Sequence, residues 1–194
     1  MAEKLMTPEF RGSYCNLIKA KHRKNPKPGD EPKYSILIVI PKKKYPKWIA
    51  SLEKNMLAAG QEKFGKPIPK NKLKHWPIRD GDEENEDGEV DENHAGCWCI
   101  SVSTRRKPNV IDKKNRKLID EEEVYSGAWY RATIRPWAWD NPEGGKGISI
   151  ELHNVLKTKD DDRLGGGVSK AEDDFADELD DDASEAEDDE DDLM

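Results

Sequence analysis

The sequence predicts an all-β or β-rich domain with one main helix, long mobile loops and a disordered acidic C-terminal tail. Strand patterns of alternating or β-branched apolar residues occur in five segments: Phe10–Lys21, Tyr34–Ile40, Cys97–Thr104, Val124–Trp139 and Lys146–Leu156. The main helical pattern lies between the second and third of them, at residues 46–64. Five strands with one interposed helix suit a five-stranded barrel of the OB type.

The first two strand candidates differ in pattern. In Phe10–Lys21, strict alternation is expected to place Phe10, Tyr14 and Ile18 on a common apolar face. The second candidate, Tyr34–Ile40, is almost continuously apolar and β-branched. That composition is typical of a central strand that is buried on both faces.

The helical segment is amphipathic. Trp48, Leu52 and Met56 recur at i, i+4 and i+8, which places them on one stripe of a helix. Gly65 ends the pattern, since glycine commonly terminates helices. We therefore expect one helix over residues 46–64 that packs its apolar stripe against the barrel.

The domain organisation follows from composition. Residues 1–9 are expected to be flexible, and residues 10–160 to form the OB-type domain. Residues 80–92 contain 9 Asp and Glu and no Lys or Arg, which predicts an acidic mobile loop. Residues 161–194 comprise a Gly165–Gly167 hinge and the acidic tail, which is predicted to be disordered.

The net charge of −8 is the sum of two opposed regions. Residues 171–194 contain 15 Asp and Glu and no Lys or Arg. Residues 1–170 contain 33 Lys and Arg against 26 Asp and Glu, a net charge of +7. This asymmetry indicates a body that binds a polyanion and a tail that repels one.

The cysteines point to a reducing compartment. The three residues Cys15, Cys97 and Cys99 are an odd number, and two of them are a single residue apart. A zinc site is not expected, because the C-x-C pair is not repeated and His94 is its only close companion. Neither a membrane-spanning run nor a secretory signal is present, so we expect a soluble intracellular protein without metal or cofactor.

The fourth strand candidate carries the clearest functional pattern. Alternate residues of a strand face opposite sides, so one side would present Trp129, Arg131, Thr133, Arg135, Trp137 and Trp139. Aromatic rings stack on unpaired bases and guanidinium groups hold phosphates, which is the composition that single-stranded nucleic acid requires. The alternative is that the tryptophans cap one end of the barrel among solvated arginines. A kink at Pro136 would also change the facing of Trp137 and Trp139.

Two basic clusters follow strand ends. They are Lys42, Lys43 and Lys44 with Tyr45, and Arg105, Arg106 and Lys107. Cations at these positions would line a groove that follows a nucleic-acid backbone. The alternative for each cluster is an ordinary solvated surface.

The acidic tail suggests competition. A tethered polyanion has a high effective concentration near a basic groove, so it would weaken nucleic-acid binding and reject duplex DNA. When displaced, it would recruit partner proteins through its few apolar residues, Phe175, Leu179, Leu193 and Met194. The alternative is a tail that only increases solubility.

No arrangement of a nucleophile and a base stands out, and the histidines are scattered. We therefore do not expect an enzyme. Two alternatives from other classes remain. One is a protein–protein adaptor with an acidic interaction tail, and the other is a metal-dependent nuclease whose carboxylates converge only in three dimensions.

Several segments resemble one family. They read FRGSYCNLIKAK, KYSILIVIPKK, EEVYSGAWYRATIRPWAW and GGKGISIELHNVLKTKDDDRLGGG, and they extend over Phe10–Phe175. The chain resembles phage single-stranded-DNA-binding proteins of a family formerly catalogued as a domain of unknown function. The resemblance implies an OB fold, no catalysis, and a role in phage DNA replication or recombination in the host cell cytoplasm. It also implies replication or recombination proteins as partners.

Overall fold

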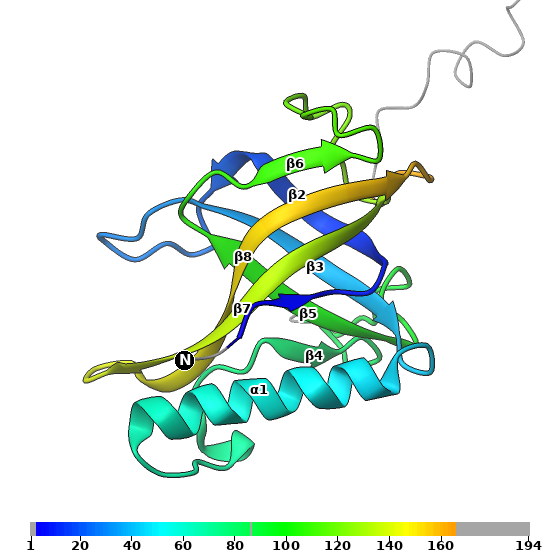
Figure 1. Ribbon diagram of the computed structural model, residues 1–194. Helices are drawn as coiled ribbons and strands as arrows, with labels where there is room; N and C mark the ends of the chain where they lie inside the picture. The colour runs from blue at the N-terminus through cyan, green and yellow to red at the C-terminus, as the bar shows by residue number, and fades with distance from the viewer. Residues whose placement is uncertain (1–2, 86, 166–194) are drawn as a thin grey trace, which may run out of the picture. The chain divides into compact units, whose positions relative to one another are not determined.

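A ring of five strands forms the centre of the computed structural model, which describes residues 3–85 and 87–165. The elements in chain order are β1 (Leu5–Met6), β2 (Phe10–Lys21), β3 (Lys33–Pro41), α1 (Pro46–Phe64), the 3₁₀ turn η1 (Lys70–Lys72), β4 (Ile78–Asp80), β5 (Cys97–Thr104), β6 (Asn109–Asp112), β7 (Trp129–Asn141) and β8 (Gly145–Lys159). The ring runs β7–β2–β3–β5–β8, and the long β7–β8 hairpin closes it (Figure 1). The predicted β-rich barrel with one main helix is confirmed.

Helix α1 lies across one end of the barrel, opposite the end that carries β6 (Figure 1). Its bounds match the predicted segment, and Leu52 and Met56 are fully buried. The helix ends where Gly65 adopts a left-handed φ of 71° and donates its N–H to Gln61. Among the described residues, no helix is long and apolar enough to cross a membrane.

Strand β3 is buried on both sides, as its composition predicts. Ile36, Ile38 and Ile40 point into the barrel, where they are at most 1% exposed. On the outer side, Leu37 and Val39 form a small second cluster with Cys99 of β5. A central strand that packs on both faces explains the run of β-branched residues.

Strand β2 breaks its alternation at Tyr14, and here the sequence prediction was wrong. Tyr14 has a φ of 45°, and the pairing register with β3 shifts between Ser13 and Asn16. This bulge turns the Tyr14 side chain outward, where it is 64% exposed. Phe10 and Leu17 are the buried members, so the inward face changes from even to odd positions.

Strand β7 begins at Trp129, later than predicted, because the preceding residues form a buried turn. Gly127 has a φ of 113°, and a Cβ there would collide with the carbonyl oxygen of Asp162. Ser126 Oγ accepts the Cys15 N–H at 2.9 Å, and Tyr130 Oη accepts the N–H of Tyr125 at 3.0 Å. The apolar residues of this segment therefore pack the turn rather than extend the strand.

The short strands β1 and β4 were not predicted, nor was the pairing of β6 with β8. β1 pairs with β7, β4 pairs with β5, and β6 runs parallel to the far part of β8. Strand β5 joins β8 through a single register pair, Ser103 with Glu151. Next to that pair, residues Ser101–Ser103 of β5 and Ser149 and Ile150 of β8 line a hollow in the barrel wall.

Candidate nucleic-acid interface

The predicted alternation of β7 holds along the strand. Tyr130, Ala132, Ile134 and Pro136 are buried, and the residues between them face outward. Pro136 pairs with Ile150 without interrupting the strand, which continues to Asn141. Trp137 and Trp139 therefore stay on the same outward face as Arg131 and Arg135.

Trp129 already has partners in the fold. Its Nε1 donates to Asp161 Oδ2 at 2.7 Å. The ammonium groups of Lys159 and Lys44 lie 4.5 and 5.8 Å from its ring centroids, within cation–π range. Lys44 also lies over Tyr45, so the first basic cluster and the start of β7 meet at this corner.

Other members of the β7 face are also engaged. Arg131 Nε donates to the Thr7 carbonyl at 3.2 Å, and Arg135 forms an ion pair with Glu151 at 2.7 Å. Trp139 Nε1 donates to Ser149 Oγ at 3.0 Å. Trp137, by contrast, is 46% exposed and makes none of these contacts.

The first basic cluster is divided in the structure. Lys42 bridges Asp80 at 2.5 Å and Asp82 at 2.6 Å, and its ammonium lies 5.1 Å from the Trp98 ring. These contacts raise the pKa of Lys42, chiefly through hydrogen bonds to the two carboxylates. Lys42 thus binds the first residues of the predicted acidic loop, residues 80–92, whereas Lys43 and Lys44 are exposed.

The second basic cluster lies in the turn that follows β5. Arg105 pairs with Glu31 at 3.2 Å, from the loop between β2 and β3. Arg106 and Lys107 are exposed. This turn is therefore available to hold phosphates close to the loop at residues 22–32.

A groove crosses the barrel wall between β5 and β8. A hollow of about 340 Å³ there is lined by Tyr14, Lys33, Ser35, Ile36, Leu37, His75, Ser101, Val102, Ser103, Ser149 and Ile150. A second hollow of about 410 Å³ is lined by Asn16, Lys21, His22, Arg23, Gly29, Asp30, Glu31, Lys33, Ser35, Ser103 and Arg105. The two share Lys33, Ser35 and Ser103, so they form one continuous depression, named here the outer groove.

The outer groove has apolar and polar parts suited to a nucleotide chain. Its floor is formed by barrel residues such as Val102 and Ile150, which are almost completely buried, and serine hydroxyl groups also line it. Trp139, bonded to Ser149, lies at the end formed by the β7–β8 hairpin. Arg105 lies at the other end, so the groove connects the β7 face with the second basic cluster.

Tyr14 is the site residue that sequence reasoning missed. It lines the outer groove and is among the most exposed large apolar side chains in the described residues. Tyr14 has a positive φ, a conformation that non-glycine residues rarely adopt. Backbone strain of this kind occurs often at functional sites. Local alternation does not reveal this residue, because only the structure shows that the buried positions pass from Phe10 to Leu17 across a bulge.

His94, two residues after the predicted acidic loop of residues 80–92, contacts the same face. His94 is 1% exposed, its Nε2 lies 3.1 Å from Ser13 Oγ, and its ring lies 5.9 Å from that of Tyr14. Its Nδ1 lies 3.2 Å from Asp91 Oδ2. Desolvation lowers the pKa of His94, with Arg79 in the same direction and Asp91 against it.

The cysteines have the properties of buried thiols. Burial raises the pKa of Cys15 to about 12 and that of Cys99 to about 11, so both stay protonated at neutral pH. Within residues 3–85 and 87–165, no three His, Cys, Asp or Glu side chains gather as a metal site would require. The predicted tail contacts Phe175, Leu179, Leu193 and Met194 lie outside the described residues.

Comparison with known proteins points to one family. The family described as "Enterobacter phage Enc34, ssDNA-binding protein" matches residues 3–192. The single-stranded DNA-binding protein of bacteriophage Enc34, solved in complex with ssDNA, superposes with a TM-score of 0.71 at 28% identity. That match covers 84% of this chain and 89% of the other. These relatives are binding proteins, not enzymes.

Two further relatives are more distant or partial. The single-stranded DNA-binding protein gp2.5 of bacteriophage T7 has a TM-score of 0.53 at 16% identity, over 95% of this chain and 99% of the other, which indicates a shared fold. Putative protein p50 of Acyrthosiphon pisum secondary endosymbiont phage 1 is 35% identical over 104 residues. The match covers 53% of each chain, about half the length of this relative.

Proposed function

Because the chain belongs to the family of the Enterobacter phage Enc34 ssDNA-binding protein, we propose that it binds single-stranded DNA without sequence preference and has no catalytic activity. One observation carries the proposal beyond the family. The outer groove joins an exposed aromatic ring, Tyr14, to cations at Lys33 and Arg105 along one barrel face. Stacking and phosphate contacts tolerate any base sequence, because every base has a π-face and every nucleotide a phosphate.

The β7 face extends this interface at the hairpin. Trp137 is exposed next to Trp139, which is bonded to the groove residue Ser149. We propose that Trp137 and Trp139 stack bases that leave the groove here, and that Arg131 and Arg135 hold phosphates. Trp129, with Lys43, Lys44 and Tyr45, forms a further cationic corner of the same face.

A salt titration tests the proposal. Labelled oligo-dT should bind, and affinity should fall steeply with salt, with a slope of about −0.7 per phosphate contact for single strands. Fluorescence anisotropy at several salt concentrations measures it, with a duplex of the same length as the control. An affinity that does not change with salt contradicts the phosphate contacts, and the absence of binding at low salt contradicts the proposal.

The proposed competition of the acidic tail with DNA rests on its charge. Residues 171–194 carry 15 acidic side chains and no Lys or Arg, so a tethered tail competes with DNA for the basic face and suppresses duplex binding. We further propose that the displaced tail recruits replication or recombination proteins in the host cell cytoplasm, through Phe175, Leu179, Leu193 and Met194. The three free thiols suit that reducing compartment.

Deletion of residues 171–194 tests the competition. The truncated protein should bind oligo-dT more tightly than the full chain and should acquire measurable duplex binding, most clearly at low salt. Replacing the acidic residues of this segment with Ser and Gln, at unchanged length, provides the matched control for charge. Unchanged affinities for both DNA forms after deletion would limit the tail to solubility or partner binding.

A further inference from the structure

A separate hollow of about 440 Å³ lies on the outside of the barrel, beyond the outer groove. Four strands build it: Met6 comes from β1, Arg131 and Thr133 from β7, Asn154 and Leu156 from β8, and Asn109 and Ile111 from β6. Ala132 and Val155 complete its lining, which is mostly apolar. The hollow is named here the β6 pocket. We propose that it binds one unstacked nucleobase of the same DNA strand, an inference that rests on the proposed function.

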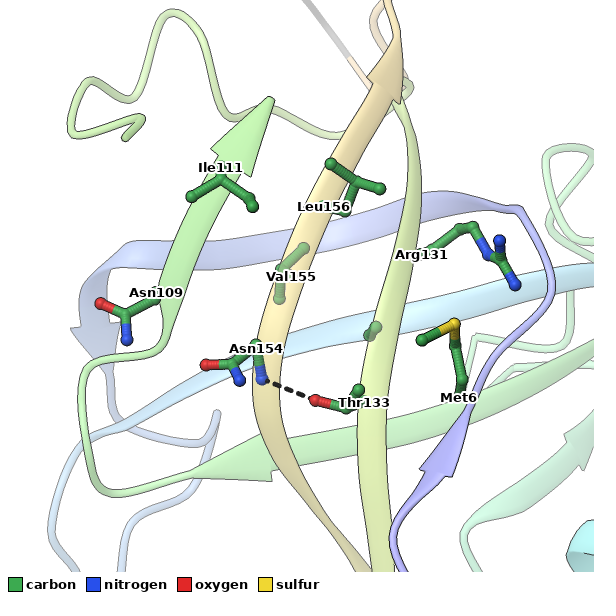
Figure 2. A pocket seen from close by; sticks show the side chains of 9 residues that line it. Met6, Asn109, Ile111, Arg131, Thr133, Asn154, Val155 and Leu156 are labelled. Carbon is green, nitrogen blue, oxygen red and sulfur yellow. Dashed lines mark hydrogen bonds between the residues drawn. The ribbon is translucent and has the colours of Figure 1, made fainter. Parts of the chain in front are cut away.

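The strand register explains how the β6 pocket is shaped. Asn109 pairs directly with Asn154, and Ile111 pairs directly with Leu156, which in turn pairs with Arg131. The pocket therefore has two neighbouring rows of side chains. Asn109 and Asn154 form an amide row, and Ile111 and Leu156 form an apolar row. Figure 2 shows Asn109 and Asn154 on adjacent strands, across the hollow from Arg131 and Met6.

The amide row is chemically suited to a base edge. The backbone N–H of Asn154 donates to Thr133 Oγ1 at 3.1 Å, which holds the strand, whereas no contact within the described residues engages the side-chain amides of Asn109 and Asn154. Each amide offers donors and an acceptor, and its orientation adapts to its partner. Every base presents donors and acceptors along its edge, so two such amides hold any base without selecting one.

The apolar row supplies the surface for the ring. Ile111 and Leu156 lie side by side, and Met6 is 59% exposed on the opposite wall. Pockets that hold a base outside its stack combine apolar walls with polar groups at the base edge. Arg131 donates its Nε–H to the Thr7 carbonyl, which holds the guanidinium beside the pocket, and its remaining N–H groups are the donors that a phosphate there would use.

The path from the outer groove to the β6 pocket is short and basic. Arg105 lines the groove and Asn109 lines the pocket, so their Cα atoms are at most about 14 Å apart along an extended chain. The exposed cations Arg106 and Lys107 lie between them. A strand that leaves the groove at Arg105 would have its phosphates held across this turn and its next base delivered to the pocket.

The experiment compares oligo-dT lengths in the full-length protein. In the wild type, affinity should rise with length until the strand reaches the β6 pocket, within the roughly 4–16 nucleotides typical of one OB fold. The double substitution Asn109→Ala and Asn154→Ala should bind the plateau-length oligonucleotide about tenfold more weakly, as expected for one base contact. It should bind the shortest oligonucleotides as the wild type does. Asn71→Ala, an exposed asparagine on η1, is the matched control.

A second measurement changes the DNA instead of the protein, and its wild-type arm does not depend on the variant's folding. At the plateau length, one terminal abasic residue should weaken binding by the wild type about tenfold. The same abasic residue should weaken binding by the double variant little, because the variant has already lost the contact that this base makes. Each end of the oligonucleotide is tested. Equal affinities of wild type and variant at every length overturn the inference, and so does an equal loss at all lengths.

Three outcomes separate the inference from the proposed function on which it rests. If the double variant binds every oligonucleotide normally but loses self-association in sedimentation, the pocket binds a second copy of the chain and the inference is overturned. If neither protein binds any oligonucleotide, the proposed function fails first. Normal binding of short strands with an unchanged plateau removes only the β6 pocket.

Discussion

The β7 face and the outer groove both display aromatic and cationic side chains, but they differ in how many of these are already engaged. On β7, Arg135 has its ion pair with Glu151 and Trp139 its hydrogen bond to Ser149. In the groove, the ring of Tyr14 contacts only His94 among the described rings and is 64% exposed. Alternation along a strand thus determines which side chains point outward, whereas distant residues determine which are free to bind.

The difference has an energetic consequence. A phosphate that binds Arg135 must compete with Glu151 for the guanidinium, and a surface ion pair of this kind is worth at most about 1 kcal/mol. Among the described rings, a base that stacks on Tyr14 meets only the tilted ring of His94. We therefore expect the groove to contribute more affinity per residue than the β7 face.

The largest expected effect is that of Tyr14→Ala. Loss of one stacking ring should weaken oligo-dT binding by roughly 1–3 kcal/mol, while Tyr14→Trp should retain most of the affinity. Anisotropy titration measures the affinities. Ile119→Ala, which removes an equally exposed apolar side chain away from the groove, is the control. If a folded Tyr14→Ala protein binds oligo-dT normally, the outer groove does not contribute more affinity per residue than the β7 face.

A second comparison separates two tryptophans of β7. Trp137→Ala should weaken ssDNA binding by about 1 kcal/mol and change the unfolding midpoint little, because the residue is 46% exposed and the ring has no hydrogen bond or cation–π partner within the described residues. Trp129→Ala should lower the stability by roughly 1–2 kcal/mol, since it removes the bond to Asp161 and the surface under Lys159.

Urea unfolding and anisotropy on both variants test this division. The prediction requires that Trp137→Ala lowers the DNA affinity without lowering the stability. It also requires that Trp129→Ala lowers the stability. If Trp129→Ala is as stable as the wild type but loses affinity, then the ring of Trp129 binds bases despite its partners. The cationic corner would then belong to the DNA path.

The sequence predicts those features of the fold and the site that depend on neighbouring residues, and it does not predict those that depend on residues far apart in the chain. The helix over residues 46–64 and the outward facing of Trp137 follow from local periodicity, which the pairing of Pro136 did not disturb. The outward turn of Tyr14 depends on a shift of register against β3, which no local pattern specifies. Likewise, Lys42 looked like a groove residue until the fold brought Asp80 and Asp82 to it.

The short strands explain the rest of what was missed. β1 has two residues and β6 has four, too few to show a period. Both are defined by pairing with the long hairpin, Leu5 with Ile134 and Asn109 with Asn154. The β6 pocket exists only because these pairs place four strands side by side, so it had no signature in the sequence.

The smallest expected effect concerns the contact of His94 with Tyr14. Desolvation lowers the pKa of His94 in the folded protein below its ordinary value of 6.5. The unfolded chain then binds more protons between the two pKa values, so stability is complete above about pH 6.5 and decreases as the pH falls toward the folded pKa. Protonation therefore weakens the buried position of His94 between Ser13 and Asp91, and with it the packing of His94 on Tyr14.

Urea midpoints at about pH 7.5 and about pH 5.5 measure this effect, compared between the wild type and His94→Gln. The wild type should lose more stability on acidification than the variant, because His75 and His153, whose pKa values are also lowered, are common to both proteins. An equal loss in the two proteins would remove His94 from the pH response. Tyr14 would then be covered or uncovered independently of the charge on the imidazole, and the groove would differ from the β7 face by exposure alone.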